Sequence, residues 1–185
     1  MAFSWTRLDS SRSIYSHRLY KLDWFGPKSE WILEQACWQY QQWLGGGVIL
    51  PKIAVNLSVR QLLQPTLIAK IDRILDRTEM KPKYLGLEIT ETAMMLNFDI
   101  TYNVLSQLSE RGIAIYVDDF GPGYAAFNNL KNFPVKSLKI DRSFVRGLAS
   151  HPRDRGIAKA LVAMAHGLNL STIAEELKPQ RNCNS

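Results

Sequence analysis

Five short apolar runs in this 185-residue chain end in acidic or amide side chains. The runs end at Asn56, Glu88, Asp118-Asp119, Asp141 and Glu175-Glu176. Carboxylate and amide oxygens bind hard divalent cations, and a carboxylate can also exchange protons with a reacting group. In a barrel of parallel strands, the residues that follow successive strands meet at one end of the barrel. The spacing therefore predicts a metal and acid/base site built from the ends of several strands.

The segments between these runs are predicted to be helices. The first is expected over residues 30–43, and the second carries apolar residues from 67 to 75 at a helical period. A third helix is expected after Asp99 and a fourth from about Asp154. Strands that alternate with helices of this length predict a parallel sheet and an α/β fold.

Individual residues are expected to begin, end or pack these helices. Pro65 suits the first turn of the second helix, and Asp99 suits the N-cap of the third. Gly112 and Gly167 stand where left-handed C-terminal caps belong. The residues expected to pack are Trp31, Leu33, Cys37 and Trp38 in the first helix, Tyr102, Leu105 and Leu108 in the third, and Ile157, Leu161, Met164 and Ala165 in the fourth.

The composition indicates one folded domain, because 46% of the residues are hydrophobic in a chain of this length. No run of about 20 apolar residues predicts a membrane span. Cys37 and Cys183 lie far apart with no ligand spacing around them, so a cytoplasmic location without disulfides or zinc is expected. The net charge is +6, but Lys and Arg are scattered, which argues against a nucleic-acid polymer as partner.

Several motifs occur together in a specific order. They are Val55-Asn56-Leu57-Ser58, Leu87-Glu88-Ile89-Thr90-Glu91, Asp118-Asp119-Phe120-Gly121, Leu138-Lys139-Ile140-Asp141-Arg142-Ser143-Phe144-Val145 and Ala174-Glu175. With this set the chain resembles the EAL domain family, which contains cyclic di-GMP phosphodiesterases and their degenerate relatives, over about residues 30–175. Each motif alone could be a helix cap or a turn, whereas the ordered set is far more specific.

The resemblance implies a (β/α) TIM-type barrel that holds one or two divalent cations, Mg²⁺ or Mn²⁺. Such cations activate a bound water and polarise the phosphate that it attacks. By resemblance, the metal ligands are Asn56, Glu88, Asp118 and Asp119, the catalytic residues are Lys139 and Glu175, and the anchor of the loop after the aspartates is Glu91. Lys139 matches the lysine that orients the attacking water.

The chain also departs from the family pattern. It contains no Glu-Ala-Leu triplet, so one metal-binding glutamate is expected to be missing, and Pro122 with Ala125-Ala126 replaces hydroxyl residues in the loop after the aspartates. The expected division is an unassigned segment 1–29, a barrel portion 30–176 and a divergent polar tail 177–185, so the barrel is expected to be incomplete at both ends. A reading-frame change or a partial gene copy would produce this pattern.

The expected function is therefore an EAL-type cyclic di-GMP phosphodiesterase that forms linear pGpG, with impaired or lost activity. Two alternatives stay open. One is a degenerate domain that binds cyclic di-GMP or a protein partner without chemistry, a second copy of the chain being one such partner. The other is a fragment that does not function.

Overall fold

The computed structural model describes residues 15–16, 27–48, 50–121, 130–146 and 151–174. These residues form a six-stranded sheet in which the strand order follows the chain and every neighbouring pair is parallel. The strands are β1 (Tyr15–Ser16), β2 (Ile53–Asn56), β3 (Leu85–Thr90), β4 (Ala114–Phe120), β5 (Ser137–Ile140) and β6 (Ser171–Ala174). The predicted α/β fold and all five predicted strands are confirmed.

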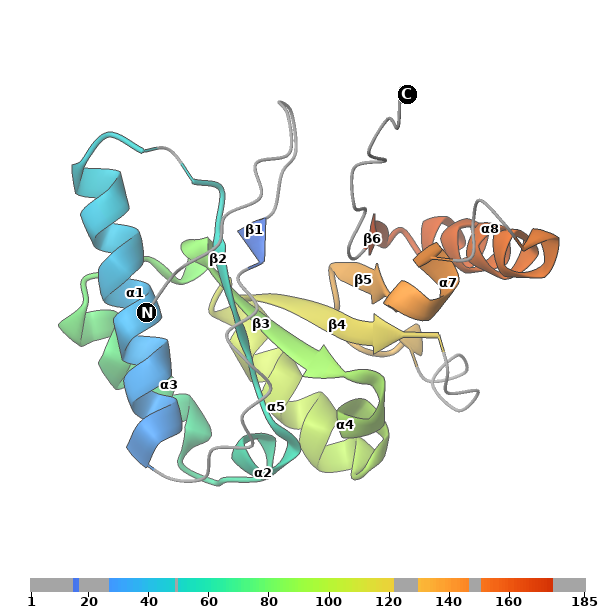
Figure 1. Cartoon of the computed structure of the whole chain (residues 1–185). Coiled ribbons are helices and arrows are strands. Elements are labelled where there is room, and N and C mark those ends of the chain that lie inside the picture. The colour runs from blue at the N-terminus through green and yellow to red at the C-terminus, as the bar shows by residue number, and fades with distance from the viewer. Residues whose placement is uncertain (1–14, 17–26, 49, 122–129, 147–150, 175–185) are drawn as a thin grey trace.

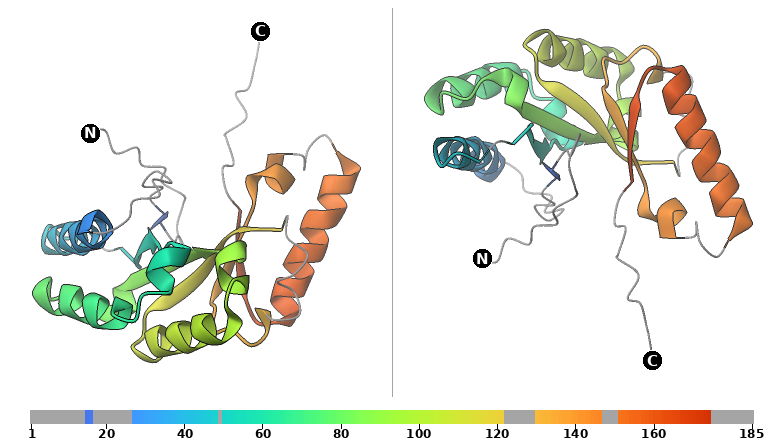
Figure 2. Two further views of the ribbon diagram at one scale, coloured as in Figure 1. Left: turned by 90° about the horizontal axis from the view of Figure 1, so that it is seen from below. Right: turned by 90° about the horizontal axis from the view of Figure 1, so that it is seen from above.

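The helices form an arc around one face of the curved sheet (Figures 1 and 2). The longer ones are α1 (Pro27–Gly45), α3 (Leu67–Arg77), α5 (Phe98–Glu110) and α8 (Pro152–Gly167). The shorter ones are α2 (Val59–Leu62), the 3₁₀ helix η1 (Pro82–Tyr84), α4 (Glu91–Met95) and α7 (Arg142–Arg146). No helix in the described part of the chain is long and apolar enough to cross a membrane. Within these residues, β1 and β6 are the two edges of the sheet.

The strand β1 lies in the segment that the sequence left unassigned. Tyr15 and Ser16 pair in parallel with Ile53 and Ala54 of β2. One short strand of the barrel is therefore present before α1, although the residues around it carry no recognisable pattern. The proposed boundaries at residues 30, 176 and 177 stay predictions, and the tail 177–185 lies outside the described residues.

Helix α1 packs through a different face from the one predicted. Leu33, Cys37 and Tyr40 are buried, whereas Trp31 is 57% and Trp38 is 43% exposed. The two tryptophans are seven residues apart and share one side of the helix, opposite the buried stripe. The prediction that both tryptophans pack inward is wrong, because α3 and β2 cover the opposite side of the helix.

The N-terminal ends of two helices also differ from the predictions. Pro65 lies before the N-cap Thr66 of α3 and so outside its first turn. Asn97, and not Asp99, caps α5 by accepting a hydrogen bond from the Ile100 N–H. Asp99 lies in the first turn instead, where its charge suits the helix dipole.

Of the two predicted C-terminal caps, one is confirmed and one is wrong. Gly112 follows α5 with φ of 91°, as predicted for a left-handed cap. Gly167 is the last residue of α8, and Asn169, with φ of 58°, takes the left-handed position after it. Asparagine tolerates this conformation better than other non-glycine residues.

Helix α8 buries fewer of its apolar residues than predicted. Ile157 of α8 is 38% exposed and Met164 is half-buried, so the predicted burial of Ile157 is wrong.

The two faces of the sheet carry different residues. Alternate residues of β3 and β4, such as Leu87, Ile89 and Val117, belong to the main hydrophobic core. The opposite, inner face carries a separate small cluster of Ala54, Ala114 and Tyr116. Strands buried on both faces have nearly continuous apolar sequences, which explains why the sequence predicted these strands.

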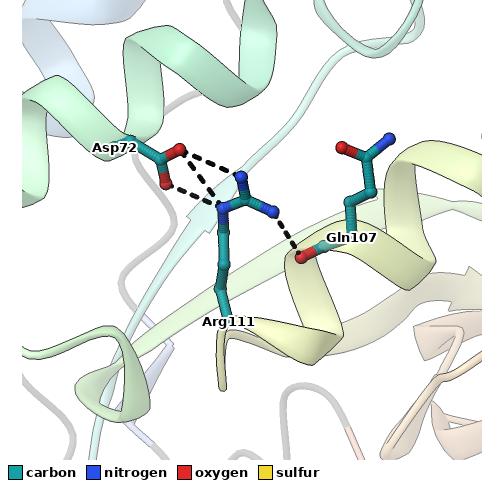
Figure 3. Close-up of polar contacts among 3 residues, drawn as sticks. All are labelled: Asp72, Gln107 and Arg111. Carbon is teal, nitrogen blue, oxygen red and sulfur yellow. Dashed lines mark hydrogen bonds and ion pairs between the residues drawn. The ribbon is translucent and has the colours of Figure 1, made fainter.

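An ion pair joins two neighbouring outer helices. Arg111, the C-cap of α5, donates from Nε to Asp72 Oδ1 at 2.9 Å and from Nη2 to Asp72 Oδ2 at 3.1 Å (Figure 3). Its Nη1 donates to the Gln107 backbone oxygen at 3.0 Å. The guanidinium therefore binds α3 and the C-terminus of α5 at the same time.

We expect Arg111→Lys to lower the free energy of unfolding by at most about 1 kcal/mol. The Arg111–Asp72 pair is about a third exposed, so solvent weakens it. Lysine keeps the positive charge but not the forked geometry of the guanidinium. Urea unfolding in low and high salt measures this change. Arg73→Lys, an exposed position on the same helix α3, is the matched control. A loss well above that of the control at 1 M salt would mean that geometry and not charge dominates.

Candidate functional site

The register of the sheet brings the predicted site residues to the carboxyl end of one face. Asn56 is paired with Glu88, and Glu88 is paired with Tyr116. Side chains alternate along a strand, so Asp118 lies on the same inner face as Tyr116, one step nearer the carboxyl end. The pairing of β4 with β5 shifts register between Val117 and Phe120, where Asp118 lies.

Lys139 of β5 reaches across the inner face between two carboxylates. Its Nζ lies 3.0 Å from Glu88 Oε2 of β3 and 2.9 Å from Asp118 Oδ1 of β4. All three side chains are nearly inaccessible, with 4%, 4% and 9% exposure for Lys139, Glu88 and Asp118. Removing Lys139 would leave two carboxylates in a buried site without a positive partner. The structure thus brings together three residues that lie 51 and 21 positions apart in the sequence.

Asn56 and Asp119 lie at the border of this cluster. Asn56 is the last residue of β2 and is exposed, in register with Glu88. Asp119 is half-buried, and its φ of 53° is in the left-handed region. Such a backbone is uncommon for a residue other than glycine and is a typical feature of functional sites.

Glu91 begins α4 directly after β3 and is buried. Its Oε2 accepts a hydrogen bond from the Gly121 N–H at 3.3 Å, so the carboxylate holds the backbone just after the paired aspartates. This is the contact that the proposed loop-anchor role requires. Gly121 has φ of 136°, a conformation that side-chain-bearing residues rarely adopt.

Two sets of predicted residues lie outside the described part of the chain. Glu175 directly follows β6, and Pro122 with Ala125-Ala126 follows Gly121. No contact of these residues is described, so the catalytic role of Glu175 and the effect of the altered loop stay predictions.

Tyr116 and Gly86 are site-forming residues that the sequence reasoning missed. Tyr116 is 2% exposed, and a Cβ placed on Gly86 would lie 2.4 Å from Tyr116 Cε2. The tyrosine ring therefore lies on the bare backbone of β3, in the layer beneath Glu88 and Asp118. Burial, with a smaller contribution from Glu88, raises the pKa of the Tyr116 hydroxyl to about 12. The ring is therefore uncharged at neutral pH and packs beneath the charged side chains.

The contact of Tyr116 with Gly86 has a signal in the sequence. Gly86 precedes Glu88 by two residues, and Tyr116 precedes Asp118 by two. In strands this spacing places each pair on one face. A glycine and a large ring two residues before two acidic groups on neighbouring strands could thus have indicated a packed layer beneath the site.

The donor set can be compared with the needs of a divalent cation. Glu88 and Asp118 carry two negative charges against one positive charge on Lys139, so the three sum to −1. Buried carboxylate oxygens with a net negative charge and a nearby amide suit Mg²⁺ or Mn²⁺. Among the described residues, however, no group of three or more His, Cys, Asp or Glu side chains gathers to hold a metal. The residues present fit a weak site formed by two carboxylates and the Asn56 amide oxygen.

Cys37 has no part in this chemistry. It is fully buried in the outer core, and desolvation raises its pKa to about 12. A thiol in this state is not a nucleophile at neutral pH.

Comparison with known proteins identifies the family. The family model of the EAL domain matches residues 25–184, most of the chain. The chain belongs to the EAL domain family. The match extends past the predicted limits 30 and 176 at both ends. The family assignment made from the ordered motifs is confirmed.

Two relatives illustrate the similarity of this EAL domain. MucR of Pseudomonas aeruginosa, a bifunctional diguanylate cyclase/cyclic di-GMP phosphodiesterase, is 40% identical over 151 residues, which are 82% of this chain and 22% of MucR. The structure of the PaMucR phosphodiesterase in complex with c-di-GMP matches with a TM-score of 0.78 and covers 83% of this chain and 62% of that one. This EAL domain spans about a fifth of the length of the curated relatives that it matches.

A more distant structure shows the same fold. The manganese/cy-diGMP complex of Klebsiella pneumoniae BlrP1 matches with a TM-score of 0.71 at 24% identity, over 81% of this chain and 38% of that one. The predicted TIM-type α/β architecture of the EAL family is thereby supported, as the part of a barrel formed by β1 to β6.

Proposed function

We propose that this EAL domain binds Mg²⁺ or Mn²⁺ and cyclic di-GMP at the carboxyl ends of β2 to β5, and that it hydrolyses the nucleotide slowly to linear pGpG. The observation that carries the proposal is the buried contact of Lys139 with Glu88 and Asp118. The similarity of this EAL domain to relatives named as cyclic di-GMP phosphodiesterases supports the choice of substrate.

The residues take complementary roles in this proposal. Glu88, Asp118 and the Asn56 amide oxygen hold the cation, which when bound lowers the pKa of water and polarises a phosphate oxygen. Lys139 orients the attacking water and offsets negative charge at the phosphate in the transition state. Glu91 keeps the Gly121 backbone in place beside the aspartates. Burial keeps bulk water away from the charged groups, which strengthens their interactions.

Asp119 and Glu175 are proposed to complete the site, as ligand of a second cation and as a further carboxylate. The 185 residues contain no Glu-Ala-Leu triplet, so the glutamate that this motif supplies in the family has no counterpart here. A missing ligand weakens metal affinity and slows turnover. We therefore place the rate well below that of a site with a full ligand set.

A second candidate function is nucleotide binding without hydrolysis. It is favoured by the donor set, because no three acidic, histidine or cysteine side chains gather in the described residues. Binding of cyclic di-GMP in Ca²⁺ without product in Mg²⁺ or Mn²⁺ would identify it. A homodimer, a protein partner and a cytoplasmic location remain predictions from the sequence.

The test is formation of pGpG by the purified chain, separated by chromatography, in Mg²⁺ and in Mn²⁺. We expect slow product formation that Glu88→Ala and Asp118→Ala each abolish. Glu110→Ala, an exposed acidic position on α5, is the matched control and should leave the rate unchanged. Activity that survives in either site variant would refute the assigned metal site.

A further inference from the structure

Three lysines lie at the amino ends of the strands, away from the carboxyl ends that form the site. Lys52 directly precedes β2, Lys83 lies in η1 just before β3, and Lys136 directly precedes β5. They come from three separate connections of the barrel. Because parallel strands begin at the same end of a sheet, these side chains gather at the amino-terminal mouth.

Two of the three lysines are in direct contact. Lys52 Nζ donates a hydrogen bond to the backbone oxygen of Lys83. The Lys83 ammonium lies 5.0 Å from the centre of the Tyr84 ring. Tyr84 in turn stacks on Tyr40 of α1, with ring centres 5.3 Å apart, so the base of the cluster is held by aromatic packing.

Within the described part of the chain, the positive charges of the cluster are not balanced by acidic groups. Burial, and then the charges of Lys136 and Lys83, lower the pKa of Lys52. Among the described residues, none of these three ammonium groups forms an ion pair with a carboxylate. Lys83 and Lys136 are exposed, and Lys52 is half-buried. The cluster thus presents positive charge to solvent at the cost of mutual repulsion.

We propose that Lys52, Lys83 and Lys136 form a binding site for a compact phosphate-bearing anion at the amino-terminal mouth of the barrel. Lysine binds phosphate as a point charge, and an anion placed among three ammonium groups would relieve their repulsion. A compact anion fits better than an extended polyanion, because the other basic residues form no continuous stripe. The site does not depend on the proposed phosphodiesterase activity.

Calorimetric titration with sodium tripolyphosphate in metal-free buffer tests this site, since the carboxylate site requires a cation that this buffer lacks. We expect binding that weakens at least tenfold in Lys52→Gln and in Lys136→Gln, and that falls steeply with salt. A parallel titration with ATP separates the possible sources: tighter binding of ATP indicates a nucleotide, and equal binding indicates a free phosphate anion.

The controls keep the test specific. Lys159→Gln, an exposed lysine of α8, should bind tripolyphosphate as the parent chain does. Thermal melts without ligand should show that Lys52→Gln and Lys136→Gln unfold cooperatively as the parent does, so that weaker binding does not result from unfolding. No binding by the parent chain, or equal weakening by Lys159→Gln, would overturn the proposal.

Discussion

Lys139→Ala is expected to lower the free energy of unfolding by about 3–5 kcal/mol and to abolish hydrolysis of cyclic di-GMP. The substitution removes the ammonium group that lies 3.0 Å from Glu88 and 2.9 Å from Asp118. Two carboxylates would then face each other on the buried inner face without a positive partner. Breaking a buried ion pair from one side is costly because the remaining charges cannot return to water.

Urea unfolding and the pGpG assay measure the two effects. Lys131→Ala, at an exposed position, is the matched control and should change stability by less than about 0.5 kcal/mol. Excess Mn²⁺ should recover part of the lost stability in Lys139→Ala, since a cation can take the place of the ammonium between the carboxylates. A variant as stable as the control would show that the carboxylates are not buried together.

Gly86→Ala is expected to destabilise the domain by about 1–3 kcal/mol, through overpacking against Tyr116. The new methyl group would lie 2.4 Å from Cε2 of the ring, and this ring is almost fully buried. The ring must move, and the layer beneath Glu88 and Asp118 moves with it. We therefore expect weaker Mn²⁺ binding in Gly86→Ala as well as lower stability.

A double-mutant cycle with Tyr116→Ala tests the contact directly. Tyr116→Ala alone should cost about 3–5 kcal/mol, because it leaves a cavity on the inner face. In the double variant the alanine at position 86 finds space, so the two effects should fall short of their sum by about 1 kcal/mol or more.

Gly156→Ala is the matched control for the glycine substitution. Gly156 is exposed on α8, and a Cβ there meets nothing within 4 Å. The control should stabilise the domain by about 0.5–1 kcal/mol, as expected for alanine in a helix. Additive effects in the cycle would mean that Gly86 and Tyr116 do not restrict each other.

The strands and the types of residue that end them were predictable because both depend on local sequence. A short apolar run closed by Glu88 or Asp118 contains its own period and its own end. Helix α2 was predictable for the same reason, although it was not predicted. Ser58 and Gln61 form a capping box, a pattern that is visible in four consecutive residues.

The packing faces and caps were less predictable. Trp31 and Trp38 are large and apolar and were expected to pack, yet the buried stripe of α1 runs through Leu33, Cys37 and Tyr40. Size and hydrophobicity favour burial, but the neighbouring α3 and β2 decide which side of the helix is covered. The sequence of one helix taken alone does not determine which of its faces is covered.

By itself the sequence determined the alternation of strands and helices, the family, and the acidic, amide and lysine groups that end or follow the strands. Only the tertiary structure decided that Lys139 lies between Glu88 and Asp118 and that Tyr116 rests on Gly86 beneath them. It also decided that Lys52 contacts the Lys83 backbone at the opposite mouth. Each of these contacts joins residues from different strands or connections. The physical reason is that the register of the sheet and the space between side chains are set by pairing across the whole barrel, which no local period encodes.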